Sequence, residues 1–122
     1  MKNNLFLLIA LLSFSLSFSQ TERANYKTAI TEFQSHYNRG DFVSVFNMLN
    51  ANFQKTLTLA KTKSFIKNNL NAKTLGKMKA VEFKNTIRTG HYYKLIFESG
   101  QGNAFLLLDS NNQISGFQIS SK

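Results

Sequence analysis

The stretch HYYKLIFESGQGNAFLLLD, residues 91–109, decides the fold class of this 122-residue chain. Tyr93, Leu95 and Phe97 occupy every second position, which is the period of a strand with one buried face. Gly100-Gln101-Gly102 predicts a turn, because glycine relaxes the backbone limits at such positions. NAFLLLD (103–109) then predicts a second strand, apolar on both faces. Two strands so close in sequence indicate an antiparallel hairpin.

The strand pattern continues on both sides of this hairpin. On the amino-terminal side, KMKAVEFKNTIR (77–88) alternates apolar and polar residues before a tight turn at Thr89-Gly90. The residues expected on its buried face are Val81, Phe83 and Ile87. On the carboxy-terminal side, Ser110-Asn111-Asn112 predicts a turn and QISGFQIS (113–120) a last strand. The carboxy-terminal half is therefore expected to be a four-stranded antiparallel meander.

Before residue 77 the apolar period changes to that of a helix. A first helix is expected over 22–38, started by Gln20 or Thr21, a second from residue 42, and a third over about 62–71. The apolar stripe of the first helix is Tyr26, Ala29, Ile30, Phe33 and Tyr37. That of the second is Phe42, Val45, Phe46 and Leu49, prolonged by Phe53, with a kink before Phe53 as an alternative. That of the third is Phe65, Ile66 and Leu70. Three helices followed by four strands predict an α+β fold, with the helices packed on one face of a four-stranded antiparallel sheet.

The segment HYNRGDF (36–42) collects side chains that could form a reaction centre. We interpret it as a corner between helices. Gly40 supplies the left-handed residue that often ends a helix, and Asp41 is a good amino-terminal cap for the next. A catalytic interpretation, with His36 as a base oriented by Asp41, does not explain why the residues come in this order.

The first nineteen residues have the pattern of a secretory signal peptide. Lys2 precedes an apolar run from Leu5 to Phe18, and Ser17 and Ser19 are the small residues expected before a cut ahead of Gln20. The run is shorter than the ~20 residues that span a bilayer. We therefore expect residues 20–122 to be a single exported domain, periplasmic or secreted and not integral to the membrane.

The composition of the remainder favours an ordinary hydrophobic core and a basic surface. The chain has no cysteine, so disulfides cannot stabilise it. All but one of its 15 basic residues follow the first nineteen, against 6 acidic ones, which leaves a net charge of +8. Such a surface attracts anions, and the basic residues of Lys61–Lys84 suggest an alternative function in binding an envelope polyanion. Nucleic acid is not expected as a partner, because no exposed aromatics are interleaved with these lysines.

The chain resembles the nuclear-transport-factor-two-like, or cystatin-like roll, superfamily. The likeness is carried by YNRGDFVSVFNML (37–49), by Gly76 and by FLLLDSNNQISGFQI (105–119), and it covers roughly residues 24–120. Within the superfamily the chain is most similar to an uncharacterised exported bacterial family. The resemblance implies helices in the concavity of a curved sheet, often around a cone-shaped pocket. It implies no single activity, because the fold hosts enzymes and binding modules alike.

Three residues are candidates for a ligand pocket: Tyr37, His91 and Tyr93. Superfamily enzymes line their cavity with such side chains, so the alternative is a small isomerase or hydrolase that uses these three. A buried carboxylate to act as base is missing, since Glu82 and Glu98 are expected to face solvent. His91, at the start of a strand beside a turn, is also expected to be exposed. We therefore assign no catalytic residue, no metal site and no cofactor.

The outer face of the sheet offers a second kind of site. Ile96, Phe105 and Leu107 should point away from the helices, and exposed apolar patches often mark interfaces. A homodimer through these residues is the corresponding hypothesis. Taken together, the sequence favours an exported, non-catalytic binding or accessory domain whose ligand, a small molecule or a protein, is unknown.

Overall fold

The structure, a computed structural model, describes residues 21–121 and has an α+β fold. The proposed signal peptide lies outside the described residues. The helices are α2 (Ala24–Asn38), α3 (Phe42–Met48), α4 (Ala51–Thr56), α5 (Leu59–Asn69) and α6 (Ala72–Leu75). The strands are β1 (Met78–Ile87), β2 (Gly90–Phe97), β3 (Gly100–Leu108) and β4 (Ile114–Ser120). The order of helices before strands is as predicted.

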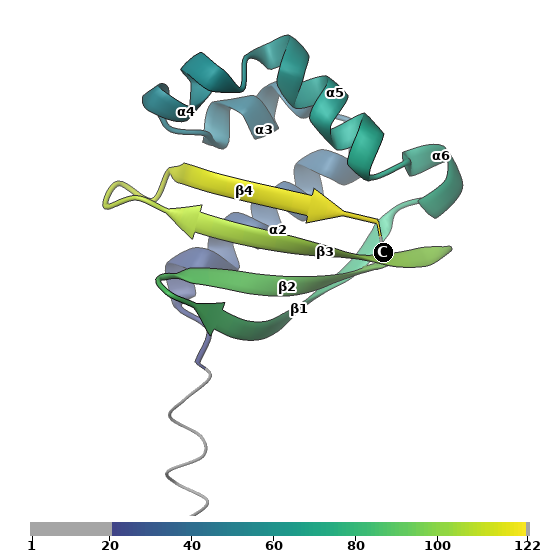
Figure 1. Cartoon of the computed structure of the whole chain (residues 1–122). Helices are drawn as coiled ribbons and strands as arrows, with labels where there is room; N and C mark the ends of the chain where they lie inside the picture. The colour runs from purple at the N-terminus through teal and green to yellow at the C-terminus, as the bar shows by residue number, and fades with distance from the viewer. Residues whose placement is uncertain (1–20, 122) are drawn as a thin grey trace, which may run out of the picture.

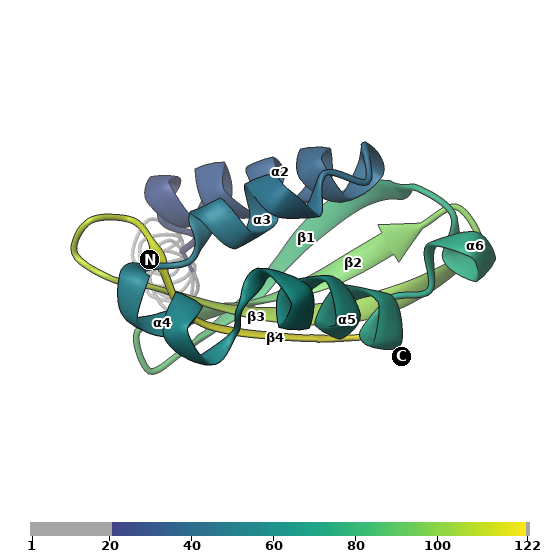
Figure 2. The same ribbon diagram turned by 90° about the horizontal axis from the view of Figure 1, so that it is seen from above.

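The four strands form one antiparallel sheet in the order β1-β2-β3-β4, which confirms the meander. Helix α2 lies behind this sheet in Figure 1, while α3, α4 and α5 lie beyond the β4 side. Seen from above in Figure 2, α2 and α3 lie on one side of the strands. Within the described residues, no helix covers the opposite face of the sheet.

The core lies between α2 and the covered face of the sheet. Each residue of the predicted α2 stripe is buried, with Ile30 and Phe33 fully inaccessible. From the sheet, Tyr93, Leu95 and Leu106 are also fully inaccessible. Aromatic edge contacts join α2 to the sheet, among them that of Phe33 with Phe117, whose ring centroids lie 5.0 Å apart.

The predicted second helix is divided into α3 and α4 at Leu49. This residue has extended backbone and forms a parallel bridge with Ile114, at the start of β4. The N–H of Asn50 donates to the carbonyl of Ile114 at 2.8 Å, and the Asn50 side chain then caps α4. The break follows from this long-range pairing, which the apolar period of the segment does not reveal.

Two helix starts differ from the expectation. Helix α2 begins at Ala24, after Arg23, with no side-chain cap, so the starts at Gln20 or Thr21 are wrong. Helix α5 begins at Leu59 because the Thr58 hydroxyl accepts the Lys61 N–H at 3.4 Å.

The turn predicted at Gly100-Gln101-Gly102 is also wrong, because these residues belong to β3 and the turn is at Glu98-Ser99. Gly102 is buried where the backbone of β4 comes close: a Cβ there would lie 2.5 Å from the carbonyl oxygen of Ser120. Glycine is needed at this position for close approach rather than for a turn.

The side predicted for Ile87 is wrong, since 43% of its surface is exposed. A bulge interrupts β1 between Phe83, which pairs with Tyr93, and Asn85, which pairs with Tyr92. Because a bulge adds one residue to the strand, the side chains that follow it point to the opposite faces of the sheet from those expected. Thr86, opposite His91, therefore takes the inner side, and Ile87 lies on the outer face.

The two edge strands are each capped at their first residue. On β1, the Asn38 side chain accepts the Met78 N–H at 2.7 Å and donates to the Met78 carbonyl at 2.9 Å. Gln34 donates to the same carbonyl at 3.0 Å. On β4, Leu49 and Asn50 pair with Ile114 as described above.

Two isoleucine substitutions test this assignment of buried and outer faces. Ile66→Ala, at a fully buried site, is expected to lower the free energy of unfolding by about 2–5 kcal/mol because it leaves a cavity. Ile87→Ala is expected to change it by less than about 0.5 kcal/mol. Urea denaturation followed by circular dichroism measures both. Equal losses for the two variants would contradict the described packing.

Candidate functional site

The corner at residues 36–42 is a helix junction, as interpreted from the sequence. Gly40 has a φ of +66°, and Asp41 caps α3 by accepting the Ser44 N–H at 3.1 Å and the Ser44 hydroxyl at 2.6 Å. These hydrogen bonds hold the pKa of the Asp41 carboxyl below its usual range. His36 points to Arg39 instead, with its Nδ1 2.8 Å from Nη2.

The structure brings together two of the three predicted pocket residues. The rings of His91 and Tyr93 lie with their centroids 6.3 Å apart. Tyr37 belongs to the other end of α2, where it packs edge-on against Phe97 at 5.6 Å and its hydroxyl donates to the Gly76 carbonyl at 3.4 Å. The place expected for Tyr37 near His91 is taken by Tyr26.

His91 is fully buried, not exposed as its position beside a turn suggested. Its ring stacks on Tyr26 at 4.0 Å, with 15° between the planes, and lies 4.9 Å from Phe83. Its Nε2 accepts the backbone N–H of Arg23 at 3.0 Å, so the proton of the neutral ring is on Nδ1. Among the described residues Nδ1 has no hydrogen-bond partner.

A carboxylate does lie beside Tyr93, contrary to the expectation that none would. The Tyr93 hydroxyl donates to Oε2 of Glu22 at 2.7 Å. The pKa of Tyr93 is raised far above its ordinary value, mainly by burial and to a smaller extent by this hydrogen bond to Glu22. Glu22 precedes α2 by two residues, and no spacing in the sequence places it against β2. This pair could have been found only from the fold.

These buried contacts describe an anchor between the start of α2 and the sheet. We call the set Glu22, Arg23, Tyr26, His91 and Tyr93 the helix anchor. The side chains of Glu22, Tyr26, His91 and Tyr93 and the backbone N–H of Arg23 form hydrogen bonds inside the protein, and His91 and Tyr93 have no surface open to solvent. A ligand could reach them only if the anchor opened, so a ligand-binding role for Tyr37, His91 and Tyr93 stays a prediction.

The buried His91 is expected to make stability depend on pH. Burial lowers the pKa of His91 below the ordinary 6.5. The unfolded chain therefore binds a proton more readily than the folded protein. The stabilisation is complete above pH 6.5 and is lost as the pH falls through the lower, folded pKa, by at most about 1.4 kcal/mol per pH unit.

Urea denaturation at pH 7.5 and pH 5.0 measures this effect. His91→Gln keeps an oxygen that can accept the Arg23 N–H but does not titrate, so its stability is expected to fall less than that of the wild type. His36→Gln, at a partly exposed site, is the matched control and should retain the wild-type dependence. An unchanged pH dependence in His91→Gln would refute the assignment.

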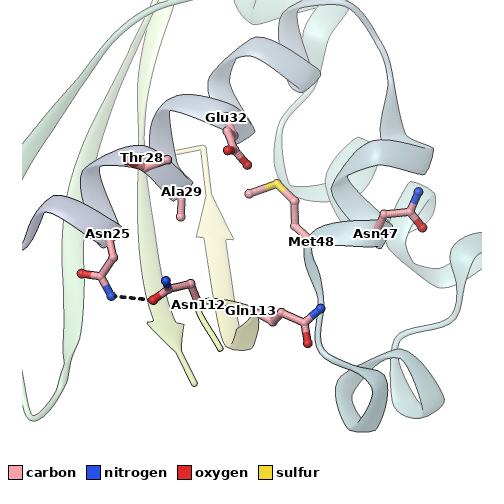
Figure 3. Close-up of a pocket in the computed structure, with 8 residues that line it drawn as sticks. All are labelled: Asn25, Thr28, Ala29, Glu32, Asn47, Met48, Asn112 and Gln113. Atoms are coloured by element: carbon pink, nitrogen blue, oxygen red, sulfur yellow. Dashed lines mark hydrogen bonds between the residues drawn. The ribbon is translucent and has the colours of Figure 1, made fainter. Parts of the chain in front are cut away.

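A solvent-open groove lies on the other side of α2, where the helix meets α3 and the β3–β4 turn (Figure 3). Its volume is about 360 Å³. The side chains that line it are Asn25, Thr28, Ala29, Glu32, Asn47, Met48, Asn112 and Gln113. Four of these eight are amides, and the sequence analysis singled out none of the eight as a site residue.

The β3–β4 side of the groove is held by Asp109. Its Oδ1 accepts the N–H groups of Asn111 at 2.9 Å and Gln113 at 3.0 Å, and its Oδ2 accepts from Asn50 at 3.1 Å. These bonds keep the pKa of Asp109 below its usual range. Asn112 takes a left-handed φ of +62°, and its side chain accepts from Asn25 of α2 at 3.0 Å. The groove is thus pre-formed.

Glu32 gives this groove its charge. Five of the six carboxylates of the chain have a hydrogen bond or ion pair inside the protein: Glu22, Asp41, Glu82, Glu98 and Asp109. For Glu32, no such partner is found among residues 21–121. Figure 3 shows its carboxylate reaching from α2 into the groove toward Met48. An unpaired carboxylate beside amides and a threonine hydroxyl can accept hydrogen bonds from a cationic or polar group.

Two negative findings concern the described residues alone. Residues 21–121 contain no cluster of three histidine, cysteine, aspartate or glutamate side chains that could hold a metal ion. The same residues form no helix with the length and apolar character needed to cross a bilayer.

A family model described as a protein of unknown function (DUF3887) matches residues 31–117. The chain belongs to this family. No curated protein and no solved structure matches the chain. The match confirms the expectation of an uncharacterised family, whereas membership of the nuclear-transport-factor-two-like superfamily stays a prediction.

The DUF3887 match runs from within α2 to within β4. It includes Glu32 and the groove residues of α3 and the β3–β4 turn, together with His91 and Tyr93. Glu22 and Tyr26 lie ahead of it. The family therefore covers most of the described structure but carries no assigned activity for any of these residues.

Proposed function

We propose that this DUF3887 protein is an exported, non-catalytic binding or accessory domain of the nuclear-transport-factor-two-like kind, periplasmic or secreted. Export is supported by the signal-peptide pattern of residues 1–19. The superfamily is supported by helix α2 packed against one face of a four-stranded antiparallel sheet. A binding role is supported by the helix anchor, which uses His91 and Tyr93 for structure. In the open groove, by contrast, the side chains of Glu32, Asn47 and Gln113 have no hydrogen-bond partner among residues 21–121.

The observation that carries the proposal is the position of Glu32. Its carboxylate lies in a groove whose walls are held by hydrogen bonds within the β3–β4 turn and from that turn to α2. A pre-formed site loses less entropy on binding than one that must be ordered. We therefore place the ligand in this groove rather than at the buried tyrosines.

The lining indicates the chemistry of the ligand. The amides of Asn47, Asn112 and Gln113 can each donate and accept, as a peptide backbone requires, and Glu32 can pair with a cation. The lining contains no aromatic ring on which a sugar could stack. The proposed ligand is a polar peptide segment of a protein partner that places an arginine or lysine against Glu32.

Titration of the ¹⁵N-labelled protein with acetyl-arginine methylamide tests this proposal. This probe carries two peptide groups and a guanidinium, and we expect millimolar binding with shifts centred on Asn25, Thr28 and Asn112. Glu32→Gln is expected to weaken binding about fivefold, because it removes one exposed charge pair worth up to roughly 1 kcal/mol.

Glu82→Gln is the matched control, because Glu82 lies on β1 and pairs there with Lys84 at 3.8 Å. It should bind the probe like the wild type. Acetyl-glutamate methylamide should bind more weakly than the arginine compound. Shifts centred outside the groove, or equal binding by Glu32→Gln and the wild type, would exclude the groove as this site.

A second function, self-association, is favoured by the outer face of the sheet. Ile96, Phe105 and Leu107 lie there, partly buried and with no described helix over them. The Phe105 ring covers Gly90, where any Cβ would collide with it, and exposed Ile87 lies opposite Gly90 on β1. A homodimer joined face to face would cover these apolar side chains.

Light scattering tests the dimer. The mature protein is expected at twice its monomer mass, and Leu107→Lys at the monomer mass, because a charge would be buried against its copy. Ser64→Lys, on the exposed side of α5, adds the same charge elsewhere and should leave the mass unchanged. A monomeric wild type, or a Leu107→Lys variant that keeps twice the mass, would rule the dimer out.

Two hypotheses from other classes remain as predictions. An isomerase or hydrolase would need His91 and Tyr93 to become accessible. A polyanion-binding module would use the basic residues of Lys61–Lys84, which lie mainly on α5, α6 and β1.

A further inference from the structure

A second depression lies beside the start of α3, where α5 ends and α6 begins. It has a volume of about 340 Å³ and is lined by Phe42, Lys67, Leu70, Asn71, Ala72 and Lys73. It shares no residue with the groove at Glu32. We call it the α5–α6 pocket.

The chain path explains why apolar atoms line the α5–α6 pocket. Helix α5 ends because Leu70 turns to extended backbone, with φ −130° and ψ 101°, and Asn71 caps α6 at once. Leu70 itself belongs to the core, and Phe42 at the start of α3 is half-buried. Phe42 and the exposed Ala72 therefore offer apolar surface to the pocket, and the buried Leu70 completes its lining.

Two ammonium groups complete the α5–α6 pocket. Lys67 and Lys73 are exposed, and neither takes part in an ion pair within residues 21–121, where the two ion pairs are Arg39–Asp41 and Lys84–Glu82. Lys63 adds a third charge one helical turn before Lys67. No acidic side chain lines the pocket. An apolar floor with a purely cationic rim complements a molecule with an apolar part and one anionic group.

We propose that the α5–α6 pocket binds a small amphipathic carboxylate, with its alkyl chain on Phe42 and Ala72 and its charged group between Lys67 and Lys73. The volume is at the lower end of small-molecule sites, which span about 300–1,000 Å³. A polyanion would need a row of basic residues along the surface. The apolar floor of the pocket can contribute to binding only if the ligand has an apolar chain to place on it. This site goes beyond the proposed peptide groove and is independent of it.

Titration with decanoate below its micelle concentration tests the proposal. In ¹H–¹⁵N spectra, saturable shifts are expected at Leu70, Asn71 and Ala72. Decyltrimethylammonium has the same tail with the opposite charge and should bind at least about fivefold more weakly, since each exposed charge contact contributes up to about 1 kcal/mol. Equal binding of the two amphiphiles, or shifts centred elsewhere, would overturn the assignment.

Paired lysine variants separate the pocket from the general basic charge. Lys67→Gln with Lys73→Gln is expected to weaken decanoate binding at least about fivefold. Lys55→Gln with Lys61→Gln removes the same charge outside the pocket and should change it less than twofold. Equal effects of the two pairs would overturn the site. So would binding to vesicles of anionic lipid without binding of free decanoate, which would indicate a membrane surface. None of these outcomes bears on the groove at Glu32.

Discussion

The stacking of Tyr26 on His91 fixes helix α2 to the sheet, and the remaining structure depends on this contact. The Tyr26 hydroxyl donates to the Thr89 carbonyl at 2.9 Å and accepts the Leu108 N–H at 3.0 Å. One side chain thereby joins the helix to the β1–β2 turn and to β3. His91 adds a direct bond to the Arg23 backbone, at a helix start that has no side-chain cap of its own.

This attachment relates the core to the proposed binding site, because both use helix α2. One side of the helix presents Tyr26, Ile30 and Phe33 to the sheet, while the neighbouring side presents Thr28 and Glu32 to the groove. A change in the angle of α2 would therefore alter the width of the groove. The buried stripe of α2 and the polar groove are thus adjacent sides of one helix.

Much of the fold could be predicted from local patterns, and most of the failures have a long-range physical cause. The α2 stripe, the Asp41 cap and the β3–β4 turn depend on neighbours in sequence and were predicted. The break at Leu49 depends on pairing with Ile114, and the exposure of Ile87 depends on a bulge set by β2. The anchor partners and the groove join segments far apart in the chain. The periodicity of apolar residues carries no information about contacts between distant segments, so these sites could be recognised only in the structure.

The capped edge strands restrict how copies of this molecule can polymerise. At the start of β1, the Asn38 side chain forms the hydrogen bonds to Met78 that the backbone of a neighbouring strand would form. At the start of β4, the backbone at Leu49 pairs with Ile114 in the same way. Unpaired strand edges are templates on which other chains can grow into fibrils. Here each edge strand is shortened at one end as a template for such growth, in a protein that has no disulfide to stabilise its closed form.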